Sequence, residues 1–258
     1  MRLYFERLGG GEPIYVFLHG LFGNADNWRS VVKQLDLAGT FYLVDARNHG
    51  RSPHTSSHTY AEQAQDVLEL LGSEGHSSAH LLGHSMGGKT AMYLALNFPE
   101  FVRSLVVGDI APRAYSGGHE AVWQALRQAD LSVKRREEVE AQLAPFIPDK
   151  GVRQFLLKNL ARDAQGRFYW RINLEGLYAA YPAILAAVSG RPYMGPALFL
   201  RGEHSDYLRP EDELEIKALF PRAAIEVVPQ AGHWIHVDSP TYVVQALRRF
   251  WAPHFMAA

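Results

Sequence analysis

The chain has 258 residues, of which 47% are apolar and 21% charged, as in a globular protein that can bury a sizeable core. Its 26 basic and 27 acidic side chains give a net charge of −1, which argues against a nucleic acid or an anionic membrane as the main partner. Cysteine is absent, which excludes disulfides, thiolate catalysis and thiolate metal ligands. Because neither a signal-peptide pattern nor an apolar run of membrane-spanning length is found, we expect a cytoplasmic protein.

Predicted strands and helices alternate in the first half of the chain. Alternating polarity predicts a strand over residues 2–8, followed by a turn at residues 9–11. Helical spacing of apolar residues predicts a helix that contains residues 28–35, one over 59–71 with Thr59 as N-cap, and one over 86–98. Between these, short apolar runs predict strands at residues 14–18, 41–44, 78–82 and 102–107. This alternation indicates an α/β fold with a mostly parallel sheet that is covered on both faces.

The alternation stops between residues 112 and 192, where the apolar spacing predicts helices. It resumes with a strand at 197–200, a helix at 211–219, a strand at 225–228 and a closing helix at 242–251. We therefore predict a core made of residues 1–111 and 192–258, with an inserted helical cap at 112–191. Parallel sheets bind ligands at the C-terminal ends of their strands, so the cap is expected to close a mainly apolar pocket there.

The stretch HLLGHSMGGKT, residues 80–90, joins a predicted strand to a predicted helix. It contains Gly83-x-Ser85-x-Gly87, the pattern of a nucleophile elbow, in which a serine sits on a strained turn. Glycines are needed on both sides because the turn brings neighbouring backbone too close for a Cβ atom. The N–H group of Met86 would then face the oxyanion of an attacked carbonyl.

The same stretch matches a phosphate-binding loop, Gly83-x-x-x-x-Gly88-Lys89-Thr90, which also lies between a strand and a helix. A strand that ends at Asp109 could supply the magnesium-binding aspartate of such a protein. If the stretch is instead a nucleophile elbow, Lys89 and Thr90 are simply residues of the first helical turn.

Several reactive side chains follow predicted strands, among them Ser85, Asp109 and His233. Because the C-terminal ends of parallel strands share one edge of the sheet, these residues can meet there. A serine nucleophile needs a base to accept its proton and an acid to orient that base. The order serine, aspartate, histidine along the chain is that of the α/β-hydrolases.

With these motifs the chain resembles the α/β-hydrolase fold esterases over essentially its whole length. The motifs are His19-Gly20, the run from Asp45 to Ser52, the elbow, and Gly232-His233. The resemblance implies Ser85 as nucleophile, His233 as base, and an oxyanion hole made by the backbone N–H groups of Leu21 and Met86. It implies no cofactor and no metal. The run from Asp45 to Ser52 is expected to hold the loop beside the pocket.

The position of the acid departs from the common pattern of this family, in which the acid is the aspartate of Gly-x-x-Asp after the seventh strand. Counting from Gly202 places Ser205 at the position of the acid, and Asp206 comes one residue late. The run GDIAP around Asp109 resembles the YbfF-like branch of bacterial esterases, where the acid occupies this earlier position and a serine the usual one. We therefore predict Asp109 as the acid and Ser205 as a hydrogen-bonding helper to the base, His233, with Asp206 as the alternative acid.

The resulting prediction is a serine hydrolase that cleaves a small acyl ester or thioester through an acyl-enzyme on Ser85. The expected partner is a small-molecule acyl substrate. Three alternatives stay open: a carbon–carbon bond hydrolase or cofactor-free lyase on the same fold, a non-catalytic ligand sensor, and the nucleotide-binding protein that the phosphate-loop pattern suggests.

Overall fold

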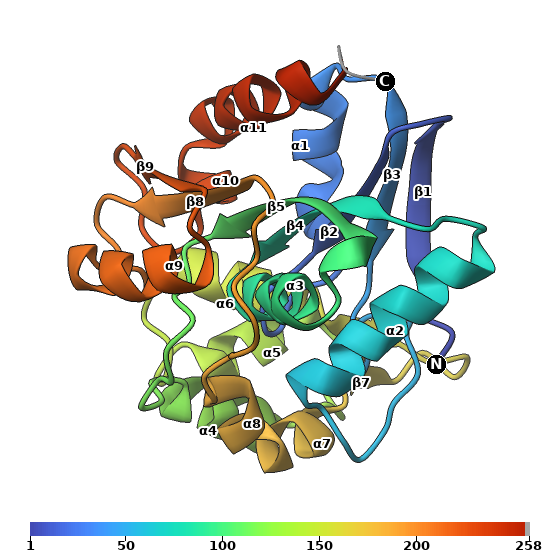
Figure 1. The fold of residues 1–258 in the computed structure, drawn as a ribbon. Helices are drawn as coiled ribbons and strands as arrows, with labels where there is room; N and C mark the ends of the chain where they lie inside the picture. Colours follow the sequence, from blue (N-terminus) through green and yellow to red (C-terminus); the bar gives the residue numbers. More distant parts are fainter. Residues whose placement is uncertain (256–258) are drawn as a thin grey trace.

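A twisted central sheet organises the protein, whose computed structural model describes residues 1–255 (Figure 1). Within these residues seven strands lie in the order β1-β3-β2-β4-β5-β8-β9, and only β1 runs antiparallel to its neighbour. The strands are β1 (Phe5–Gly10), β2 (Ile14–Leu18), β3 (Gly39–Val44), β4 (Ala79–His84), β5 (Val102–Gly108), β8 (Ala197–Gly202) and β9 (Ala223–Val228). The predicted α/β fold with a mostly parallel sheet is thus confirmed.

Helices cover both faces of this sheet (Figure 1). One face carries α1 (Asp26–Leu35) and α11 (Pro240–Phe255), and the other carries α2 (Tyr60–Ser73), α3 (Met86–Asn97) and α9 (Glu213–Leu219). Alternate residues of β2 belong to different cores: Tyr15 and Phe17 pack with α1 and α11, whereas Val16 packs with α2 and α3. The unbroken apolar run of β2 therefore follows from burial on both faces. Three short helical turns complete this part: η1 (Pro99–Phe101), η2 (Pro210–Asp212) and α10 (Ile235–Asp238).

Most predicted elements agree with the structure to within a few residues. Thr59 caps α2 as predicted, since its side chain accepts a hydrogen bond from the N–H of Glu62 while the Glu62 carboxylate accepts from the N–H of Thr59. The first strand was placed too early, because β1 continues through the glycines that were predicted to turn. Gly9 pairs with Thr40 there, and a Cβ on Gly9 would lie 2.3 Å from the carbonyl oxygen of Gly39. The glycine at this position therefore allows the two strands to approach each other closely.

A mainly helical block, residues 112–191, connects β5 to β8 and lies at one end of the sheet (Figure 1). Its helices are α4 (Glu120–Gln128), α5 (Arg136–Leu143), α6 (Lys150–Leu157), α7 (Leu174–Ala179) and α8 (Tyr181–Leu185). It also contains a short hairpin of β6 (Leu160–Arg162) and β7 (Phe168–Trp170), which the sequence did not predict. Strands of three residues are too short to show a period in the sequence. In the structure, Gly166 allows the turn between them with a φ of 78°.

Among the described helices, none combines the length and the hydropathy that crossing a lipid bilayer requires.

Lys89 connects the helical block to the core. It lies on α3 and is 1% exposed, and burial lowers its pKa to about 7. Its Nζ donates hydrogen bonds to the carbonyl oxygens of Arg113 (2.7 Å) and Ala186 (2.5 Å), near the start and the end of the block. The ring centroid of Tyr115 lies 4.7 Å from the same nitrogen. Lys89 is thus engaged in backbone contacts inside the protein, an arrangement unlike that of a phosphate-binding lysine, and it does more than occupy a helical turn.

Replacing Lys89 should therefore destabilise the protein. The change Lys89→Ala leaves two partly buried carbonyl groups without a donor and opens a cavity, so we expect a loss of about 2–4 kcal/mol in the free energy of unfolding. Urea denaturation measures this loss. The exposed Lys33 of α1 provides the control, because Lys33→Ala should change stability by no more than about 0.5 kcal/mol. Equal stability of the two variants would contradict the connecting role of Lys89.

Candidate active site

Ser85 occupies a sharp turn between β4 and α3. Its φ of 53° and ψ of −120° lie in a region that side-chain-bearing residues rarely adopt. A Cβ on Gly83 would lie 2.1 Å from the carbonyl oxygen of Gly87, and a Cβ on Gly87 would lie 2.5 Å from that of Leu18. Both glycines are therefore required by close backbone approach, as the sequence predicted. The N–H of Ser85 donates to the carbonyl oxygen of Gly108 (3.0 Å), which fixes the turn against β5.

Asp109 follows β5 directly and is completely buried. Its Oδ2 lies 2.8 Å from Nδ1 of His233 and also accepts a hydrogen bond from the hydroxyl of Ser205. Its Oδ1 accepts a hydrogen bond from the backbone N–H of Gly202 (2.9 Å). The structure thus brings Asp109, Ser205 and His233 together, although they lie far apart in the sequence.

Asp206 is not part of this cluster. The residue is exposed, and its carbonyl oxygen accepts a hydrogen bond from Arg209. Within residues 1–255 the Asp206 carboxylate forms no hydrogen bond and no ion pair, so it does not contact His233. The loop after β8 therefore directs the Ser205 hydroxyl toward the Asp109 carboxylate, and not toward the base as predicted, while Asp206 lies toward solvent.

The electrostatics of the cluster follow from burial. Burial raises the pKa of Asp109 to about 7, while the hydrogen bonds from Ser205 and Gly202 act in the opposite direction. Burial also lowers the pKa of His233 to about 3, with a smaller contribution from His119. His233 is therefore neutral in the resting protein. When its Nδ1–H group is donated to Asp109, its Nε2 atom is unprotonated, which is the form that a general base needs.

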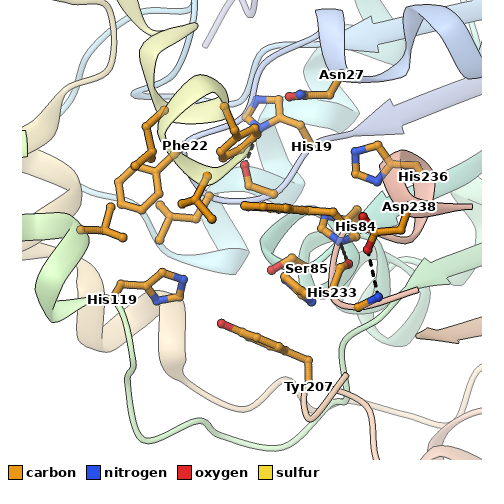
Figure 2. Close-up of a pocket in the computed structure, with 18 of the residues that line it drawn as sticks. His19, Phe22, Asn27, His84, Ser85, His119, Tyr207, His233, His236 and Asp238 are labelled. Carbon is orange, nitrogen blue, oxygen red and sulfur yellow. Dashed lines mark hydrogen bonds between the residues drawn. The ribbon is translucent and has the colours of Figure 1, made fainter. Parts of the chain in front are cut away.

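Ser85 and His233 line a cavity of about 480 Å³ at the C-terminal edge of the sheet (Figure 2). Part of its wall is apolar and includes side chains from the helical block. These apolar side chains are Leu21, Phe22, Val122, Val152, Phe155, Leu156 and Trp234. The cavity has the size and the mixture of apolar and polar lining that are typical of sites for small ligands.

The loop after β2 lies next to the elbow, since a Cβ on Gly20 would lie 3.2 Å from the Cβ atom of Ser85. Leu21 lines the same small side cavity as Ser85 and Met86, and in the described part of the chain neither the N–H of Leu21 nor that of Met86 is bonded to a protein acceptor. Residues around Asp45 hold this loop in place, as expected. The N–H of Ala25 donates to the Asp45 carboxylate (2.6 Å), and that of Phe22 donates to a ring nitrogen of the buried His49 (3.2 Å).

Two residues of the site were not predicted. Tyr207 stacks on His233 with ring centroids 3.7 Å apart and an angle of 20° between the rings, and His119 lines the cavity beside it. Both residues come from loops, where no periodicity or motif spacing identifies a side chain that points into a cavity. The only sequence signal is that Tyr207 lies two residues after Ser205.

Comparison with known proteins agrees with this geometry. Residues 13–240 match the family described as "alpha/beta hydrolase fold". The chain is 43% identical to the "sn-1-specific diacylglycerol lipase ABHD11" of Mus musculus, with 93% of this chain and 81% of that protein covered. It is 34% identical to "Esterase YbfF" of Escherichia coli, with 93% and 92% covered.

A solved structure titled "Marine microorganism esterase" superposes with a TM-score of 0.94 at 39% identity, covering 96% of this chain and 99% of that one. The match spans the sheet, its covering helices and the helical block alike. The chain therefore belongs to the α/β-hydrolase fold family and, within it, to the ester hydrolases that include YbfF-like esterases.

Proposed function

We propose that this esterase cleaves small acyl esters or thioesters through an acyl-enzyme on Ser85, with His233 as base and Asp109 as acid. The observation that carries the proposal is the 2.8 Å contact between Nδ1 of His233 and Oδ2 of Asp109, in a cavity that Ser85 also lines. His233 accepts the proton of the Ser85 hydroxyl as the serine attacks the carbonyl carbon, and then donates it to the departing alcohol or thiol. Water, activated by the same histidine, releases the carboxylic acid.

Asp109 acts in this mechanism by holding the base and by stabilising its charge. Once His233 takes up a proton, the imidazolium lies beside the Asp109 carboxylate in a region from which water is largely excluded, where their attraction is strong. Ser205 and the N–H of Gly202 occupy the remaining sites on the carboxylate and keep it directed toward the ring.

The backbone N–H groups of Leu21 and Met86 are the proposed oxyanion hole. Both belong to residues beside Ser85, and both are without a protein acceptor in the described residues. Met86 is the first residue of α3, so the positive end of the helix dipole adds to its effect on a developing negative charge.

The proposed substrate is a small molecule, because a cavity of about 480 Å³ is of the size that is typical of small-molecule sites. We further propose that residues 112–191 act as a cap, since Val122, Val152, Phe155 and Leu156 contribute apolar wall to the cavity from that block. An acyl chain packed against these side chains loses contact with water, which favours binding by the hydrophobic effect. The names of the relatives, esterase and lipase, are consistent with such acyl substrates.

The nucleophile is tested by Ser85→Ala. The variant should lose at least about 10³-fold in kcat on a nitrophenyl ester and keep its fold, because the serine serves chemistry and not packing. Steady-state hydrolysis and circular dichroism measure the two properties. Labelling of Ser85 in the wild type by a fluorophosphonate, read by mass spectrometry, is the positive control. Near-normal turnover by the variant would rule out the proposed mechanism.

The acid is tested by comparing two amide substitutions of the same size. Asp109→Asn preserves the shape of the side chain but favours the wrong tautomer of His233, so kcat should fall by about 10⁴. Asp206→Asn alters an exposed carboxylate that is not bonded to His233, so activity should change by no more than a few-fold. Both variants are assayed on one ester at one pH after their fold is checked. Loss of activity in Asp206→Asn but not in Asp109→Asn would show that Asp206 is the acid.

Ser205 is tested by the pH dependence of kcat/KM. Its hydroxyl stabilises the charged form of Asp109 and so lowers the pKa of that carboxyl. In Ser205→Ala the pKa of the Asp109 carboxyl rises, so the Asp109–His233 pair takes up its first proton at a higher pH. Once the pair is protonated, His233 can no longer act as the base. The acidic limb of the profile should therefore move upward by about 0.5–1 pH unit. An unchanged or downward-shifted limb would show that Ser205 does not support the acid.

A further inference from the structure

Two polar side chains that the proposed acyl transfer does not use lie close to the nucleophile: Tyr207, from the loop after β8, and His119, which precedes α4. Together with Ser85 they line both the main cavity and the small side cavity next to it. Figure 2 shows the hydroxyl end of Tyr207 directed toward His119, with Ser85 nearby. They therefore form a polar part of the wall within reach of a substrate that is attacked by Ser85.

The position of Tyr207 is fixed by contacts at its ring and its backbone. The ring stacks on His233, the carbonyl oxygen accepts a hydrogen bond from the Tyr115 hydroxyl (2.6 Å), and the N–H donates to Ser205 Oγ (3.2 Å). The Tyr207 hydroxyl, by contrast, has no hydrogen-bond partner among the described residues. Burial raises the pKa of Tyr207, so the phenol keeps its proton and can both donate and accept.

His119 is held in a similar way. Its Nδ1 atom is hydrogen-bonded to the hydroxyl of Tyr181 (2.6 Å), whereas its Nε2 atom has no partner in the part of the chain that the structure describes. Burial lowers the pKa of His119, so the ring is neutral at neutral pH. A neutral imidazole whose Nδ1 is already engaged offers one further hydrogen-bonding position at Nε2.

The charges near Tyr207 and His119 limit the kind of chemical group that these two side chains can bind. Neither side chain carries a charge, and Asp149 and Asp238 line the main cavity, which disfavours an anion. The amine of the side cavity, that of Lys89, already donates to two carbonyl oxygens. An apolar group would remove water from both polar atoms and replace none of their hydrogen bonds. A neutral group that both donates and accepts, such as a hydroxyl, satisfies the pair.

We propose that Tyr207 and His119 bind a free hydroxyl group of the substrate close to the attacked carbonyl, so that hydroxylated esters are the preferred substrate class. This inference rests on the proposed esterase mechanism. The hydroxyl can belong to the alcohol part, as in a partial ester of a diol or polyol, or to the acyl part, as in an ester of a hydroxy acid. Both sources present the same hydrogen-bonding chemistry to the pair.

The test compares esters that differ by one hydroxyl in place of one methyl. In the first arm 2-hydroxyethyl butanoate is compared with propyl butanoate, and in the second ethyl 3-hydroxybutanoate, as each enantiomer, is compared with ethyl 3-methylbutanoate. Each kcat/KM is divided by the rate of hydroxide-catalysed hydrolysis of the same ester, which removes differences in intrinsic reactivity. We expect a preference for the hydroxylated ester of about tenfold or more in one arm. The arm that shows it identifies the part of the substrate that carries the hydroxyl.

Variants then assign the preference to the two side chains. Tyr207→Phe keeps a ring against His233 but lacks the hydroxyl, so the ratio of the two normalised kcat/KM values should fall toward one, whatever happens to the absolute rates. His119→Asn places an amide where Nδ1 lies and removes the Nε2 position, so it should reduce the ratio as well. His119→Gln places its amide near Nε2 and should retain part of the preference. Tyr169→Phe, an exposed tyrosine of β7, is the matched control and should keep the full ratio.

The outcomes separate the two proposals. Hydrolysis of the esters without any preference in either arm would overturn hydroxyl recognition and leave the esterase mechanism standing. A preference that survives both Tyr207→Phe and His119→Asn would also overturn it. Failure to hydrolyse any of the esters, by a protein that is folded, would count against the proposed function itself and the inference that rests on it.

Discussion

Burying the carboxylate of Asp109 is the constraint around which the site is built. A carboxylate without exposure to water is costly unless hydrogen-bond donors replace the lost hydration. Here three donors do so, from Gly202, Ser205 and His233, and they come from the end of β8, the loop after it and the loop after β9. The carboxylate, which follows β5, is therefore satisfied only when the end of β8 with its loop and the loop after β9 meet it at one edge of the sheet. The same contacts that lower the cost of burial also fix the orientation of the histidine.

Helix α3 connects this edge to the rest of the protein. It begins directly after Ser85, and one turn later Lys89 donates to backbone carbonyls near both ends of the helical block. The position of the block above the cavity is thus tied to the helix that follows Ser85, the proposed nucleophile. On the sheet side, the close approach at Gly83 and Gly87 leaves the elbow no room to shift. Ser85 is consequently held by rigid elements on both sides.

Four polar side chains of the cavity share one electrostatic property, which is that burial favours their neutral form. Burial lowers the pKa values of His84, His119 and His233, and it raises the pKa of Tyr207. A neutral histidine is required for proton transfer from a serine, and neutral hydrogen-bonding groups suit an uncharged ester better than an anion. The charge state that the proposed mechanism requires and the class of substrate proposed for this wall therefore have the same physical origin.

The sequence alone was enough to predict the α/β fold and the elbow around Ser85, because these depend on apolar periodicity and on a local motif with a steric cause, and its Gly232-His233 motif indicated His233 as the candidate base. It also indicated Asp109 through the run around it, since Ser205 stands where the usual acid would be. Only the tertiary structure decided what Lys89, Tyr207 and His119 contact. Lys89 sits in a local pattern that fits two kinds of site, and its burial depends on residues about 24 and 97 positions away. The other two lie on loops, where side-chain direction is set by long-range packing, which leaves no period in the sequence.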